Sequence, residues 1–114
     1  MAGLAVTYTP STTGRIIILV SLNMVNNTSG DGTQAQIRYG TGTAPANGAA
    51  LTGTAVGSLL KSRASAANAN TPATLVALVT GLAVGTQVWI DVSQAAITGG
   101  TASLTGIYIL IMEL

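Results

Sequence analysis

The sequence predicts an all-β protein, a single-domain β-sandwich of the jelly-roll type with about eight strands over residues 1–114. Two observations support this fold class: short runs rich in β-branched residues, and Gly-bearing turns between them. A chain of 114 residues also fits one domain, and it shows no internal repeat and no heptad pattern. The expected strands cover residues 4–9, 15–25, 33–39, 59–66, 74–82, 86–96 and 104–114.

The stretch 78–92, L-V-T-G-L-A-V-G-T-Q-V-W-I-D-V, is the most informative part of the chain for the fold. Its residues alternate on both sides of a Gly-Thr turn, which predicts two strands joined over a short corner. Val88, Ile90 and Val92 are expected on one face of the second strand and Trp89 on the other. Trp89 is the only tryptophan, so we expect a core or interface anchor; a platform for a sugar is the alternative.

Strands 15–25 and 104–114 carry apolar residues on both faces. The first is hydrophobic enough for a helix, but its Ile and Val content and its Gly and Asn flanks favour a strand. A sandwich covers only one face of each strand, so the other face needs a partner. The isoleucines of the last strand are assigned to the core, because β-branched side chains pack well there. A trimer axis would cover this other face in all copies at once. The residues assigned to this trimer interface are Tyr108, Leu110, Met112, Ile17 and Leu19.

Two segments between the expected strands have loop composition. Residues 26–32, N-N-T-S-G-D-G, form the strongest turn signal, since Asn, Asp and Gly tolerate positive φ. Residues 40–58 are a long Gly/Ala/Thr segment, and such a loop in a compact domain is either functional or held by its neighbours.

The composition favours assembly with other proteins. Only 6% of the residues are charged and 48% are hydrophobic. Uncharged surfaces of this extent are typical of contacts with a sister subunit or a larger assembly. The alternative is a weakly charged monomer covered by Ser, Thr, Asn and Gln.

The same composition argues against catalysis, and we expect no enzyme activity, no metal and no cofactor. The chain has no His and no Cys, which removes the commonest general base and the thiolate ligands. The only carboxylates, Asp31, Asp91 and Glu113, are scattered over separate strands and turns, whereas acid–base hydrolysis needs two that converge.

Nucleic acid and membranes are not expected as partners. The net charge is +1 and no basic run exists. The apolar run 16–20 is far shorter than the roughly 20 residues that cross a bilayer, and the N-terminus lacks the layout of a signal peptide. We expect a protein made in the host cytoplasm that stays soluble until it assembles.

Arg38, Lys61 and Arg63 are the candidate contacts to another protein. Lys61 and Arg63 are expected on one outward strand face, where they can grip an acidic patch of a partner. A solvated strand edge or an intersubunit ion pair is the alternative.

Two pairs of segments carry a resemblance to known proteins. G-T-Q-V-W-I-D-V at 85–92, followed by A-S-L-T-G-I-Y-I-L at 102–110, resembles the ending of the C1q/TNF-like jelly rolls. R-Y-G-T-G-T-A-P-A-N-G-A-A at 38–50 and V-T-G-L-A-V-G-T at 79–86 are similar to small capsid cement or decoration proteins of tailed bacteriophages. The corner at 81–86 also occurs in fibronectin-type sandwiches.

The resemblance implies a homotrimer that binds without catalysis, with the last strand central in the trimer. It leads us to expect a structural virion protein on the capsid surface, which cements or decorates a phage capsid by binding the major capsid protein or other virion proteins. The alternative is a carbohydrate- or receptor-binding tip of a fibre or spike, which exposed aromatic and acidic side chains on the loops would favour.

Overall fold

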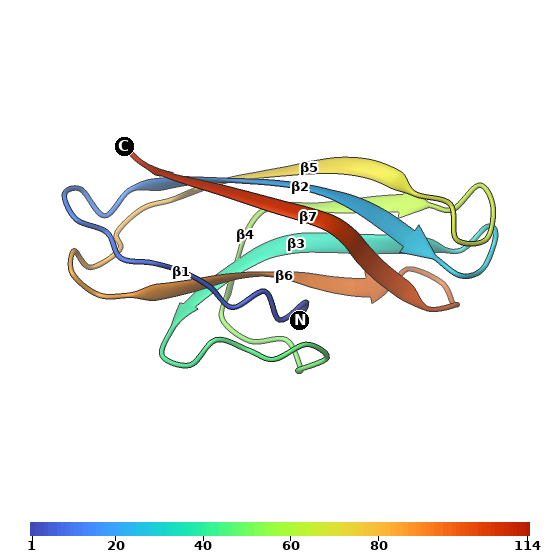
Figure 1. Ribbon diagram of the computed structural model, residues 1–114, viewed down its shortest axis with the longest axis horizontal. Helices are drawn as coiled ribbons and strands as arrows, with labels where there is room; N and C mark the ends of the chain where they lie inside the picture. The colour runs from blue at the N-terminus through green and yellow to red at the C-terminus, as the bar shows by residue number, and fades with distance from the viewer.

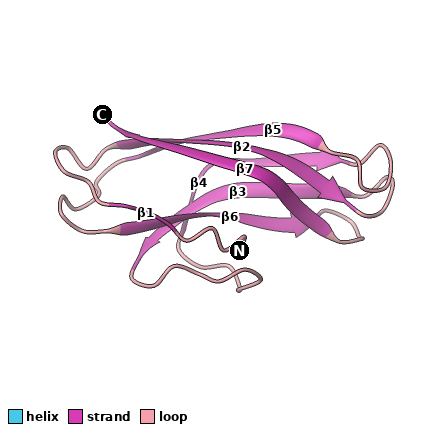
Figure 2. Cartoon of the chain, viewed as in Figure 1, coloured by secondary structure: helices cyan, strands magenta, loops and turns pink.

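The computed structural model describes residues 1–114 and contains seven strands and no helix (Figures 1 and 2). The strands are β1 (Val6–Tyr8), β2 (Ile16–Asn26), β3 (Gly32–Thr41), β4 (Thr54–Arg63), β5 (Thr71–Val79), β6 (Val88–Ala96) and β7 (Ala102–Glu113). They form a four-stranded sheet in the order β1-β6-β3-β4 and a three-stranded sheet in the order β5-β2-β7. All pairings are antiparallel, so the all-β prediction is confirmed, with seven strands where about eight were expected.

Strand β4 begins earlier than the sequence indicated. The expected loop 40–58 is shortened to residues 42–53, because β3 runs to Thr41 and β4 starts at Thr54. The Gly/Ala/Thr composition of 54–58 looked like a loop, yet this segment pairs with β3 around a register shift between Ala35 and Ile37. Gly57 lies at this irregularity with φ +73, and a Cβ there would come within 2.6 Å of the Val76 carbonyl oxygen. Glycine is therefore required by a bulge inside the strand.

The corner between β5 and β6 connects the two sheets. Strand β5 pairs with β2, whereas β6 lies between β1 and β3 in the other sheet. The two strands expected on either side of the corner are present, but they are not hydrogen-bonded to each other. The Leu82 amide donates to the Gly14 carbonyl (3.0 Å) and the Gly85 amide to the Pro10 carbonyl (2.8 Å), which fixes the corner to the turn before β2.

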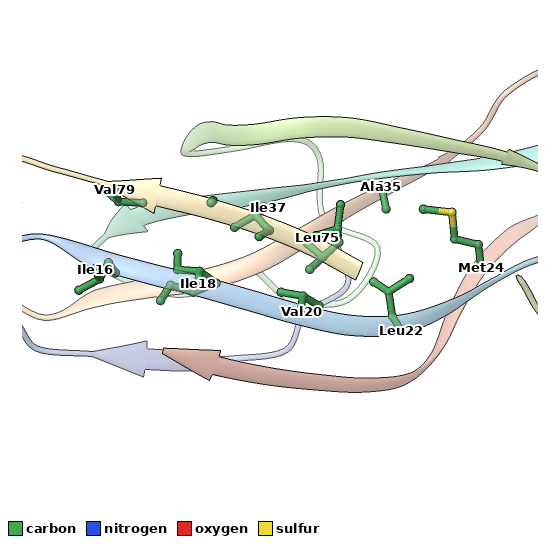
Figure 3. Packing of buried hydrophobic residues seen from close by; sticks show 12 residues of the cluster. Ile16, Ile18, Val20, Leu22, Met24, Ala35, Ile37, Leu75 and Val79 are labelled. Atoms are coloured by element: carbon green, nitrogen blue, oxygen red, sulfur yellow. The ribbon is translucent and has the colours of Figure 1, made fainter. Parts of the chain in front are cut away.

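The core lies between the two sheets, and β2 supplies more of it than any other strand (Figure 3). Every second residue of β2 points inward, as the two-residue period of a strand requires. The isoleucines of β7 pack on this core, which confirms their inward assignment. Fully burying one Ile, Leu, Val or Met side chain contributes about 1.5–3 kcal/mol to the stability of the fold. The buried core residues are Ile16, Ile18, Val20, Leu22, Met24, Ala35, Ile37, Leu75, Ala77, Val79, Ile90 and Val92.

The outer faces of the two sheets differ in what covers them. The N-terminal segment and the loop between β3 and β4 lie on the side of the four-stranded sheet, at the bottom of Figure 1. The three-stranded sheet runs along the top of the same view, and no loop folds over it. The molecule measures 46 × 24 × 19 Å, so this second face extends along its longest dimension.

Candidate functional site

The outer face of the three-stranded sheet is built from three rows of side chains that cross β5, β2 and β7. In the first row Ile17 lies between Leu78 and Met112, and in the second Leu19 lies between Val76 and Leu110. In the third row Ser21 lies between Thr74 and Tyr108. Neighbouring strands are about 4.8 Å apart, so each row is a continuous strip. The apolar residues of these rows are called the apolar face below: Ile17, Leu19, Val76, Leu78, Tyr108, Leu110 and Met112.

The apolar face is open to solvent. The exposed fractions are 66% for Tyr108, 55% for Val76, 52% for Met112, 50% for Leu78 and 44% for Leu110. At about 100 Å² each, these five side chains present on the order of 500 Å², which is near the upper end for the largest patch of a monomer. The structure thus brings together all five residues that the sequence assigned to an interface, and adds Val76 and Leu78 from a third strand.

The charged residues nearest the apolar face are Arg15 and Glu113 at one of its ends, and Glu113 lies on the core side of β7, opposite Ile16. Glu113, the last residue of β7, accepts hydrogen bonds from the backbone amides of Ser11, Thr12 and Thr13, and from the Thr12 hydroxyl. These bonds, the Thr12 hydroxyl foremost, lower the pKa of Glu113 from 4.5 to about 2, against the opposing effect of burial. Burial, together with the Glu113 charge, raises the pKa of Tyr8. The carboxylate therefore holds the turn before β2 and leaves the apolar rows uncharged.

Trp89 is an anchor, but outside the core between the sheets. It is 3% exposed on the outer side of β6, where its ring packs against Gly40 and Gly53. Its indole N–H donates to the Thr41 carbonyl oxygen at 3.1 Å. The 42–53 loop thus folds onto the ring, and no ring face is left for stacking on a sugar.

Asp91 is the anchor of the N-terminal segment, a role that the sequence did not indicate. It is 1% exposed and accepts hydrogen bonds from the amides of Gly3 (3.0 Å), Leu4 (3.2 Å) and Val92 (2.8 Å). Two of these donors are almost the whole chain away in sequence. A buried carboxylate that accepts from three backbone amides has a structural role.

The three candidate cations lie on the other sheet, away from the apolar face. Arg38 donates from Nε to the Thr52 carbonyl (2.7 Å) and from Nη2 to the Gly53 carbonyl (2.8 Å), so it also fastens the 42–53 loop. Arg63 donates to the Gly30 carbonyl at 2.9 Å, and Lys61 is exposed opposite Gln34.

The chain offers no converging set of catalytic or metal-binding groups. Asp31 lies in the turn between β2 and β3, where it accepts from the Thr98 hydroxyl. Asp91 lies within β6 and Glu113 at the end of β7. No group of three or more His, Cys, Asp or Glu side chains is placed to hold a metal ion. None of the elements is a helix of the length and apolar character needed to cross a membrane.

These features define an all-β protein of two antiparallel sheets. The N-terminal segment and the 42–53 loop cover part of the outer face of the four-stranded sheet, and the outer face of the three-stranded sheet is apolar and open. No protein-family model, no curated protein and no solved structure matches the chain.

Proposed function

We propose that the protein is a structural virion protein that assembles as a homotrimer through the apolar face and cements or decorates a phage capsid. The observation that carries the proposal is the set of aligned apolar rows on β5, β2 and β7, which nothing in the chain covers. Large open apolar patches on soluble proteins are typical of interaction sites.

Self-association is supported by the size of this patch. Two such faces in contact bury roughly 1,000 Å², which is about the lower limit for a specific protein–protein interface, so nearly the whole face has to take part in the contact. An uncharged apolar surface is buried most completely by another surface of the same character, and copies of the chain provide it.

The trimer is supported by the position of β7 and by the resemblance of 85–92 and 102–110 to the C1q/TNF-like proteins. β7 is an edge strand of its sheet, so a neighbouring subunit can approach it from the side. Its outward residues Tyr108, Leu110 and Met112 then surround a threefold axis, which buries the same face in every copy. A two-fold dimer packed face to face is the competing arrangement.

The capsid role is supported by the low charge of the chain and the resemblance of 38–50 and 79–86 to phage cement proteins. In this role the trimer binds the outer surface of the major capsid protein. The alternative, a sugar- or receptor-binding tip, has less support, since Trp89 is buried and the loops carry few aromatic or acidic side chains.

Two measurements test the proposal. Sedimentation equilibrium at micromolar concentration is expected to give the mass of three 11.3 kDa chains, and a monodisperse monomer would overturn self-assembly. Phage particles made without the protein should then bind the purified trimer on their capsids, with saturation at a fixed number of copies. Binding to tail fibres or to host cells instead of capsids would contradict the cement role.

A further inference from the structure

The outer face of β3 and β4 gathers three of the four cationic side chains of the protein. Because side chains alternate along a strand, every second residue of β3 and of the second half of β4 shares this face. The residues on this side of β3 and β4 are called the cationic face below: Gln34, Gln36, Arg38, Leu59, Lys61 and Arg63.

Lys61 and Arg63 have no carboxylate directly opposite them on this face. The three carboxylates of the protein accept hydrogen bonds from neutral donors: Asp31 from Thr98, Asp91 from backbone amides and Glu113 from residues 11–13. Asp91 is the one carboxylate on the outer side of this sheet; it lies opposite Arg38 and beneath the N-terminal segment. Lys61 and Arg63 lie at the far end of the face, at the level of Gln34 and Gly32.

The same face is hollowed next to these cations. A depression of about 220 Å³ lies between Leu51 of the 42–53 loop and Leu59 of β4, with Gln34 and Gln36 among its lining residues. Gln36 donates to the Gly57 carbonyl at 2.8 Å, which fixes one amide, and no hydrogen bond holds the side-chain amide of Gln34. A second depression lies beside Lys61 and Arg63.

The spacing of these groups matches an extended chain. Residues two apart on a strand are about 6.6 Å apart and point the same way, in this sheet and in any extended peptide laid along it. Lys61 and Arg63 are two apart, and so are Gln34 and Gln36. Carboxylates at alternate positions of a bound peptide would therefore meet both cations, while glutamine amides can bond its backbone groups.

We propose that the cationic face binds an acidic, extended segment of a partner protein, with carboxylates two residues apart against Lys61 and Arg63. This proposal rests on the proposed function only in assigning that segment to another virion protein. The binding surface itself is on the opposite sheet from the apolar face, so partner binding and self-assembly use separate surfaces.

The test uses a synthetic decapeptide with Glu at alternate positions and Ser between, titrated at about 0.1 M salt, where the Debye length is about 10 Å, while the amide signals of the protein are followed by NMR. We expect shifts at Gln34, Gln36 and the β4 residues. The double variant Lys61→Gln with Arg63→Gln should raise the dissociation constant about tenfold, because exposed charge pairs contribute modestly and additively. Arg15→Glu is the matched control: it changes the net charge by the same amount but lies before β2. It should leave the dissociation constant within about twofold, since a distant charge is screened.

Four results of the titration would overturn the proposal: no binding at millimolar peptide, equal binding of the peptide with Gln in place of Glu, equal weakening by Arg15→Glu, or shifts caused by a neutral oligosaccharide and not by the peptide. The monomeric variant expected from Leu110→Asp separates this proposal from self-assembly. If that variant still binds the peptide, the cationic face acts independently of the oligomer. If it loses binding while remaining folded, the peptide site depends on the subunit contact and the proposal is wrong.

Discussion

Leu19 and Leu110 are direct partners across the pairing of β2 with β7, and both side chains point away from the core. Their chain neighbours Val20 and Ile109 are also partners, and these point inward. The same two strands thus build the core with one set of residues and the apolar face with the other. Substitutions at adjacent positions of β7 should therefore separate folding from assembly.

In the proposed trimer three like charges would meet near the axis, so Leu110→Asp should give folded monomers, each with its core intact. Ile109→Asp should abolish folding, because it places an unpaired carboxylate against the core. Circular dichroism and sedimentation distinguish the two results. Leu59→Asp is the control for Leu110→Asp, since Leu59 has nearly the same exposed fraction (45% against 44%) on the opposite sheet. If Leu59→Asp dissociates the oligomer and Leu110→Asp does not, the subunit contact lies on the four-stranded sheet.

Gly53→Ala should destabilise the protein by about 3 kcal/mol and expose Trp89 to water. A Cβ at this position would lie 2.3 Å from the indole and 2.4 Å from the Tyr39 carbonyl oxygen, at φ +70. Urea unfolding gives the loss in free energy of unfolding, and a red shift of the tryptophan emission reports the displaced loop.

Gly42→Ala separates the backbone strain from the clash, because Gly42 has φ +81 but nothing within 4 Å of the Cβ that alanine would add. It should cost only about 1 kcal/mol and leave the emission unchanged; equal effects of both substitutions would contradict the packing of the loop on the indole.

The alternation of apolar residues was enough to predict the all-β fold and the two faces of β7, because side-chain direction on a strand depends only on the two-residue period. The same reasoning predicts that Trp89 lies on the other face of β6 from Val88 and Ile90, as observed. It could not show that the outer side of β6 is covered too. That cover comes from the 42–53 loop and the N-terminal segment, and no local pattern encodes contacts between residues so far apart in sequence.

Strand pairing and the role of the polar residues were also beyond the sequence. The sequence of the corner after β5 is compatible with a hairpin and with a connection to the other sheet, and it does not distinguish the two. Asp91 showed no sign of its role, because its two distant donors, Gly3 and Leu4, are ordinary residues in the sequence. The Gly and Ala content of residues 54–58 predicts a loop, because both residue types are depleted in strands, but pairing with β3 overrides that preference.

Glu113 makes the stability depend on pH in the acid range. Its pKa is lowered from 4.5 in the unfolded chain to about 2 in the folded protein, so its contribution is fully present above about pH 4.5. As the pH falls from there toward 2, the folded state must take up a proton against these hydrogen bonds, and the contribution is lost. The melting temperature of wild type should drop over this window more than that of Glu113→Gln, which does not titrate there. Parallel curves for the two proteins would show that the hydrogen bonds to Ser11, Thr12 and Thr13 do not stabilise the carboxylate.

Asp91→Asn should release the N-terminal segment while the sandwich stays folded. The carboxylate offers both oxygens, Oδ2 to the Gly3 amide and Oδ1 to the amides of Leu4 and Val92. Asparagine has one oxygen, so at least one donor faces an NH₂ group, which costs about 1–3 kcal/mol for a buried amide left unpaired. Hydrogen exchange should accelerate at Gly3 and Leu4 and stay slow in β2, whose core contacts are untouched.

Asp31→Asn is the control, because Asp31 accepts from a side-chain hydroxyl in a turn and holds no backbone amide of the N-terminal segment. If exchange at Gly3 and Leu4 is as slow in Asp91→Asn as in wild type, the other contacts of the segment, such as the Ala2 amide on the Val92 carbonyl (2.8 Å), are sufficient to hold it.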